Sequence, residues 1–151
     1  MELGETAPTA PVASPAPWHL WVIGTVGLLW NAFGCYDYVM SKTSPETYLA
    51  QMGMGQETVD YMASFPAWLT AFWALGVWGS LAGSVLLLAR SRHAVTAFAA
   101  SLFGLAVSQG YETLFLKPPF PPPLAVVGTI WIALILQLVY ASRMKRASVL
   151  A

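Results

Sequence analysis

The sequence predicts an all-α polytopic membrane protein: a four-transmembrane-helix bundle with a short amphipathic segment between helices 1 and 2. Charged residues make up only 9% of the chain and hydrophobic residues 57%, whereas an ordinary soluble domain carries about 25% charged residues. A membrane-spanning helix needs about 20 mostly apolar residues. Four stretches are long enough: residues 18–40, 67–89, 94–116 and 123–142. Seven Trp, six Tyr and seven Phe suit aromatic belts at two membrane interfaces.

The region before the first apolar stretch predicts a disordered tail. Residues 1–17 hold four prolines among Ala, Ser and Thr, a composition that does not pack. They lack the basic start of a secretory signal peptide, and no convincing cleavage site follows the apolar stretch, so we expect the first span to be retained. The predicted organisation is therefore a tail at 1–17, a membrane domain at 18–142 and a basic tail at 143–151.

Small residues recur at helical spacing on the first three spans. Helices in lipid approach each other closely where glycine and other small residues form the contact. We therefore predict helix packing through Gly24, Gly27, Gly34, Gly76, Gly79, Gly83 and Gly104. The GxxxG pair formed by Gly79 and Gly83 leaves homodimerisation open as an alternative to packing within one bundle.

Residues 41–66 predict one or two short amphipathic helices on the membrane surface. Ser44, Pro45 and Glu46 form a helix-start pattern, with proline at the first position and an acid in the first turn. Apolar residues follow at near-helical spacing. A solvated loop is the alternative interpretation of this segment.

The connections and their charges predict the orientation. A tight basic turn at residues 90–93 makes the second and third spans antiparallel neighbours, and the proline-rich residues 117–123 predict a stiff connector to the fourth span. With four spans, one side carries five basic residues and the other carries Lys42 and Lys117. The five are Arg90, Arg92, Arg143, Lys145 and Arg146. The positive-inside rule then places both termini in the cytoplasm.

Two acids inside the spans are the main candidates for a functional site. Charged residues in a membrane are costly and by default prompt a functional hypothesis. Asp37 and Glu112 lie at similar depth in the outer half, and Asn31 and Gln109 lie near them. One hypothesis is a shared, outward-facing binding site of these four residues for a substrate, cation or proton. The alternative is that the acids pair with Lys42 and Lys117, while Asn31 makes an interhelical hydrogen bond.

Catalytic and metal sites are not expected. His19 and His93 both fall at the cytoplasmic edge, far from Asp37, and the single Cys35 has no partner cysteine. Nucleotide-binding and hydrolase motifs are absent from the sequence, so we expect no enzyme activity, no metal and no cofactor. A net charge of zero gives no basic surface for nucleic acid. The expected partners are the lipid bilayer and either further copies of this chain or a larger membrane complex.

Three runs in the sequence carry a family resemblance. They are Leu29 to Met40 (LWNAFGCYDYVM), Phe65 to Trp68 (FPAW) and Ala74 to Gly79 (ALGVWG). With these runs the chain resembles a family of small four-span inner-membrane proteins of bacteria, especially proteobacteria, whose members often carry the label hypothetical protein or sugar transporter. The resemblance covers roughly residues 18–116. It implies four spans in a bacterial inner membrane and, from that label, transport.

Two functions are compatible with the sequence. The first is a small transporter or ion-coupled carrier with an outward-facing polar site, working as a homo-oligomer. It requires Asp37, Asn31 and Glu112 to converge on one cavity. The second is a non-catalytic accessory or scaffold subunit of a larger membrane complex. It predicts a filled bundle in which the acids pair with lysines or face water.

Overall fold

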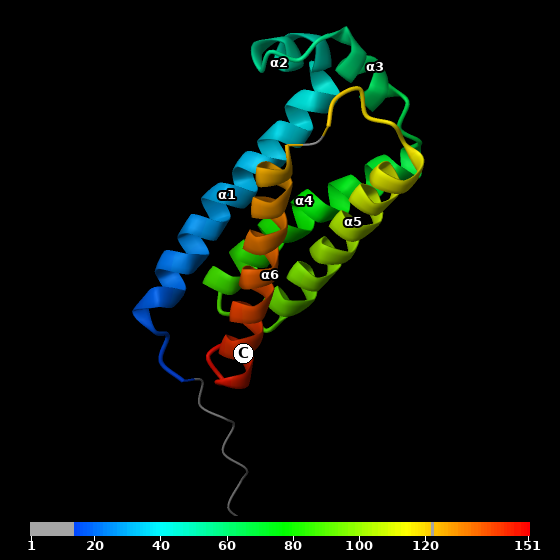
Figure 1. The fold of residues 1–151 in the computed structure, drawn as a ribbon. Coiled ribbons are helices and arrows are strands. Elements are labelled where there is room, and N and C mark those ends of the chain that lie inside the picture. The colour runs from blue at the N-terminus through cyan, green and yellow to red at the C-terminus, as the bar shows by residue number, and fades with distance from the viewer. Residues whose placement is uncertain (1–13, 122) are drawn as a thin grey trace, which may run out of the picture.

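The described chain folds into six helices, of which the four long ones run along an elongated bundle and the two short ones lie at one end (Figure 1). The computed structural model describes residues 14–121 and 123–151, and these contain helices and loops but no strand. Most of the predicted disordered tail lies outside the described residues. The helices are α1 (Trp18–Thr43), α2 (Pro45–Gln51), α3 (Gln56–Ala63), α4 (Ala67–Leu88), α5 (His93–Phe115) and α6 (Leu124–Arg146).

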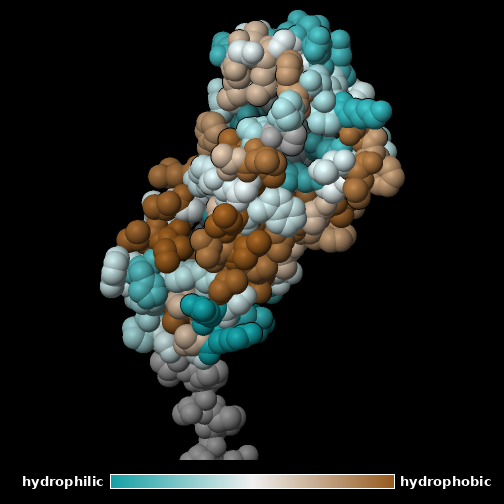
Figure 2. All heavy atoms as spheres, in the orientation of Figure 1, coloured by the Kyte–Doolittle hydropathy of each residue, from teal (hydrophilic) through white to brown (hydrophobic). Residues whose placement is uncertain are grey.

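Three of these helices are long and apolar enough to cross a membrane: α4, α5 and α6. The 26-residue α1 is long enough to cross a membrane. Polar residues such as Asn31 and Asp37 lower its mean hydropathy, so α1 is not among these candidate spans. The fold therefore supports three spans by length and composition, and the fourth stays a prediction. Apolar side chains gather over the middle of the visible face, with hydrophilic side chains toward both ends (Figure 2).

The four long helices pack in the order α1, α4, α5, α6. Small residues let α4 and α5 approach most closely. A methyl group added at Gly104 would lie 2.7 Å from the Phe72 carbonyl oxygen, and one at Gly83 would lie 2.6 Å from the Phe98 ring. The Ser101 hydroxyl donates a hydrogen bond to the Gly76 carbonyl across the same interface. At Gly104 the two backbones therefore meet directly, and at Gly83 the Phe98 ring fills the space that a side chain would need.

The packing role predicted for Gly34 does not match the structure. A methyl group added there would meet nothing within 4 Å. Gly34 follows Gly24 and Gly27 at roughly helical spacing, but Cys35 is the buried residue at this level of α1, and its thiol donates to the Val77 carbonyl at 3.3 Å. Gly24 and Gly27 lie closer to their neighbours, at Leu88 of α4 and Gln137 of α6 respectively. The contact face of α1 thus passes beside Gly34.

The end of the bundle that holds the C-terminus is closed by the chain folding back on itself. The predicted basic tail is helical up to Arg146, and beyond it Val149 and Leu150 are buried in the core cluster with Leu87 and Phe98. Arg90, which ends α4 with a left-handed φ of 56°, donates side-chain hydrogen bonds to the carbonyls of Ser14 and Val149. The α4–α5 turn, the start of α1 and the end of α6 therefore meet at one end.

The opposite end carries α2 and α3 (Figure 1). Helix α2 begins at Pro45, as the helix-start pattern predicts, and buries Tyr48 and Leu49. Helix α3 has no fully buried residue, although Tyr61 packs edge to face on Phe65 at 5.1 Å between ring centroids. Residues 41–66 therefore contain two short helices, here called the cap, and the alternative interpretation as a solvated loop is wrong.

Candidate functional site

The residues predicted to share one polar site are bonded to separate partners. Asp37 accepts a hydrogen bond of 2.8 Å from the Tyr48 hydroxyl of the cap. Gln109 accepts one of 2.6 Å from the Trp131 indole nitrogen, which ties α5 to α6. Asn31 instead faces α4 and α6 near the middle of the bundle. Three of the four side chains are therefore engaged at three different interfaces.

Glu112 lies close enough to the cap helix α3 for its charge to act on Tyr61. It is half-buried, and its negative charge acts on Tyr61. Burial, followed by this charge, raises the pKa of the Tyr61 hydroxyl. The buried hydroxyls of Tyr61 and Thr58 have no hydrogen-bond partner within the described residues. Asp37 bonds to Tyr48 of α2, whereas Glu112 lies near Tyr61 of α3, so the two acids contact different cap helices.

The alternative acid–lysine pairs are also not formed in the described part of the chain. Lys42 Nζ donates to Thr70 Oγ1 at 3.3 Å and lies 5.3 Å from the centre of the Trp73 ring. A cation over an aromatic face is attracted by the ring quadrupole. Lys42 therefore turns from its own helix toward α4, because an aromatic surface and a hydroxyl are available there, and Asp37 takes Tyr48 as its partner instead.

The Tyr48–Asp37 contact holds the cap on the end of α1. Tyr48 is only 5% exposed, and its ring packs edge to face on Tyr36 at 6.1 Å between centroids. Burial, with the hydrogen bond to Asp37 and the charge of that carboxylate, raises the pKa of Tyr48 to about 12. The neutral phenol is thus the form that the folded cap stabilises.

The Tyr48 contact predicts a cap that loosens at high pH. A tyrosine whose pKa is raised from 10.0 to about 12 by folding stabilises the folded state fully below pH 10, and this contribution disappears as the pH rises toward 12. We expect faster proteolysis within residues 44–66 over that interval. In Tyr48→Phe the cleavage rate should be raised already at neutral pH and should change less between pH 10 and 12. Equal pH profiles for the two proteins would contradict the contact.

A buried polar network joins three helices at mid-depth. The Asn31 amide nitrogen donates to Gln137 Oε1 at 2.8 Å, to Ser84 Oγ at 2.8 Å and to the Ser80 carbonyl at 3.1 Å. Gly27 leaves room for the Gln137 amide, because a methyl group added at Gly27 would lie 3.4 Å from Gln137 Cδ. The interhelical hydrogen bond predicted for Asn31 is therefore present, with α4 and α6 as partners.

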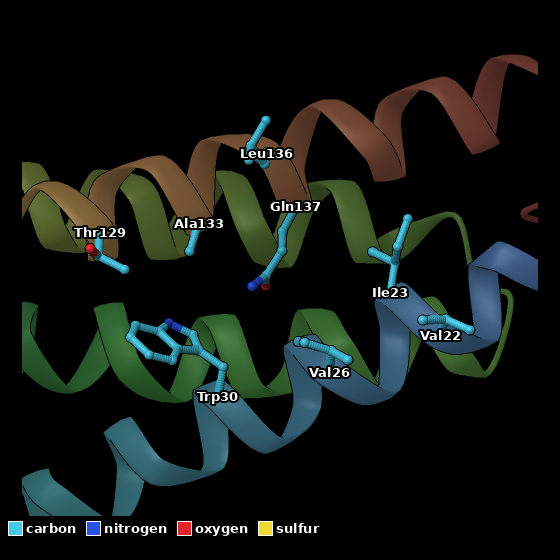
Figure 3. Close-up of a pocket in the computed structure, with 9 residues that line it drawn as sticks. Val22, Ile23, Val26, Trp30, Thr129, Ala133, Leu136 and Gln137 are labelled. Atoms are coloured by element: carbon cyan, nitrogen blue, oxygen red, sulfur yellow. The ribbon is translucent and has the colours of Figure 1, made fainter.

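A groove opens between α1 and α6 beside this network (Figure 3). Its volume is about 410 Å³. Gln137 reaches into it from α6 and Trp30 reaches toward α6 from α1 (Figure 3). The remaining lining residues are mostly apolar: Val22, Ile23, Val26, Gly27, Thr129, Ala133 and Leu136. None of the predicted site residues Asp37, Glu112, Asn31 and Gln109 lines the groove.

Sequence reasoning missed Gln137, Trp131 and Tyr140 as partners. Gln137 pairs with Asn31, Trp131 with Gln109, and Tyr140 with His19 at 2.5 Å. One signal was present in the sequence: Asn31 and Gln137 are polar residues within the apolar stretches 18–40 and 123–142, and a polar side chain in such a stretch needs a partner.

The described residues contain no group of three or more His, Cys, Asp or Glu side chains placed to hold a metal ion. Comparisons with known protein families, with curated proteins and with solved structures found no match.

Proposed function

We propose that α1 also crosses the membrane, which makes a four-span protein. Helix α1 runs antiparallel to α4 along its whole length, with Gly24 beside Leu88 at one end and Lys42 bonded to Thr70 at the other. A helix packed along a spanning helix occupies the same depth of bilayer. Its polar Asn31 is satisfied by α4 and α6, which offsets the lower hydropathy of α1.

We further propose that the membrane is a bacterial inner membrane with both described ends of the chain in the cytoplasm. The α4–α5 turn and residues 147–151 lie together with the basic residues of α6, and cytoplasmic loops carry excess Lys and Arg. A reporter fused after Ala151 should therefore be active only on the cytoplasmic side. Accessibility of that reporter solely from outside would reverse the assignment of the cap and of every loop.

Between the two functions open from the sequence, the geometry favours a non-catalytic accessory subunit of a larger membrane complex. The observation that carries this proposal is the separate bonding of Asp37, Asn31 and Gln109. A carrier with a polar site needs these groups free and facing one cavity. Here Asp37 joins α1 to the cap, Asn31 joins α1 to α4 and α6, and Gln109 joins α5 to α6. A scaffold protein uses polar side chains in lipid in this way, to hold its helices together.

Site-specific photocrosslinking in intact membranes tests this role. Crosslinking amino acids placed at the exposed Leu29 and Phe33 of α1, Phe103 of α5 and Ile132 of α6 sample different lipid-facing surfaces. An accessory subunit should yield one discrete heteromeric product from one surface at native expression. A product of this chain with itself alone would favour the homo-oligomeric carrier. Lipid adducts alone from all four positions would contradict both assemblies. The buried Phe98 position is a matched negative control.

A further inference from the structure

The α1–α6 groove has the dimensions of a small-molecule site. Ligand pockets usually have volumes of about 300–1,000 Å³, and this open groove has a volume of about 410 Å³. It extends from Val22 to Trp30 on α1, which is about 12 Å at 1.5 Å per residue. A groove of this length and volume suits a ring or a short chain.

An amide without a full set of partners faces this groove. Gln137 is only 8% exposed, and its Oε1 is used by Asn31. Its Nε2 has no hydrogen-bond acceptor among residues 14–121 and 123–151. A methyl group added at Gly27 would lie 3.5 Å from this nitrogen, which places it at the groove floor. An N–H group without an acceptor is costly in hydrocarbon, so an occupant that brings an oxygen acceptor gains a hydrogen bond there.

The depth of Gln137 selects among lipophilic molecules. Gln137 lies fourteen residues after the start of the apolar stretch 123–142 and five before its end, because the last turn of α6 is basic. At 1.5 Å per residue it lies about 7 Å from the middle of that stretch. The hydrocarbon core is about 30 Å thick, so the ester carbonyls of a bilayer lipid lie about 15 Å from its midplane. An acyl chain in the groove would present only methylene groups to the amide. The acceptor must belong to a molecule that dissolves in the core with its carbonyl.

An aromatic wall at one end of the groove favours a flat ring. The Trp30 indole forms the wall at one end and extends toward α6 (Figure 3), and aromatic rings prefer stacked or edge-to-face neighbours. At the other end the hydrogen bond between His19 and Tyr140 joins α1 to α6 just beyond Val22. From these contacts we infer that the groove binds a lipid-soluble molecule with a flat, carbonyl-bearing ring, the chemistry of a quinone. This inference does not depend on the accessory role.

Titration of the full chain in lipid nanodiscs with a decyl-substituted benzoquinone tests the inference. Quenching of tryptophan fluorescence reports binding, and protein-free nanodiscs correct for partitioning. Ala133→Phe fills the groove and should weaken binding at least tenfold. Ile135→Phe adds the same ring on the exposed side of α6 and should leave binding unchanged. Gln137→Leu removes the amide donor and should weaken binding about fivefold, the effect of one hydrogen bond.

A competition experiment on the wild-type protein does not depend on any variant folding. Menadione, a ring with carbonyls and no long chain, should displace the decyl quinone, whereas dodecane should not. Displacement by both with equal potency would overturn the inference in favour of an acyl-chain groove. Equal quenching in Ala133→Phe, Ile135→Phe and wild type would also overturn the inference. So would a smaller native assembly in Ala133→Phe, because it would identify the groove as a contact with another protein chain.

Discussion

Gly104→Ala should destabilise the bundle more than any other single methyl addition on α5. The added carbon would lie 2.7 Å from the Phe72 carbonyl oxygen and 2.8 Å from the Gly76 nitrogen. Both atoms belong to the α4 backbone, so neither can rotate away as a side chain does. Overpacking costs about 1–3 kcal/mol, and we expect the upper end of that range. Thermal unfolding in mild detergent, followed by circular dichroism, measures the change.

Gly110→Ala is the matched control on the same helix. A methyl group there meets nothing within 4 Å, and replacing a mid-helix glycine by alanine favours the helix by up to about 1 kcal/mol. The two substitutions should therefore shift the unfolding midpoint in opposite directions. A fall of similar size for both would mean that helix propensity or expression, and not the α4–α5 contact, determines the result.

Asn31→Leu should give the second large effect. It removes the donor shared by Gln137, Ser84 and the Ser80 carbonyl, and it leaves their oxygens without that donor in the middle of the bundle. Interhelical hydrogen bonds in membranes are worth roughly 0.6–2 kcal/mol, and a buried group left unpaired adds about 1–3 kcal/mol. We expect a loss of about 2 kcal/mol, measured by the same unfolding assay.

A double-mutant cycle measures the interaction energy between Asn31 and Gln137. Replacing both partners of a buried hydrogen bond by apolar groups is often nearly neutral. Asn31→Leu combined with Gln137→Leu should therefore lose less stability than the sum of the two single variants. Additive losses would show that Asn31 and Gln137 do not interact, and would also remove the polar floor of the groove.

The sequence by itself determined the all-helical class, the presence of helices long and apolar enough to cross a membrane, and most element positions. Hydrocarbon demands long, apolar, internally bonded helices, so span positions are visible locally: residues 67–89 and 94–116 became α4 and α5 within one residue at either end, and the cap began at Pro45. The fourth stretch differed most, since α6 extends to Arg146. Gly76, Gly79, Gly83 and Gly104 stand at the α4–α5 contact because small residues are what close helix packing requires.

Only the tertiary structure decided which polar groups meet. Position along a span gives the depth of a side chain, but its direction around the bundle depends on how each helix is rotated against its neighbours. Asp37 and Glu112 were placed at one depth from sequence, yet Asp37 bonds to Tyr48 of α2 and Glu112 lies near Tyr61 of α3. The same rotation aims Gln137 between α1 and α6. The residues that line the groove from α1 and α6 are more than 90 positions apart in the sequence, and no local pattern encodes the groove.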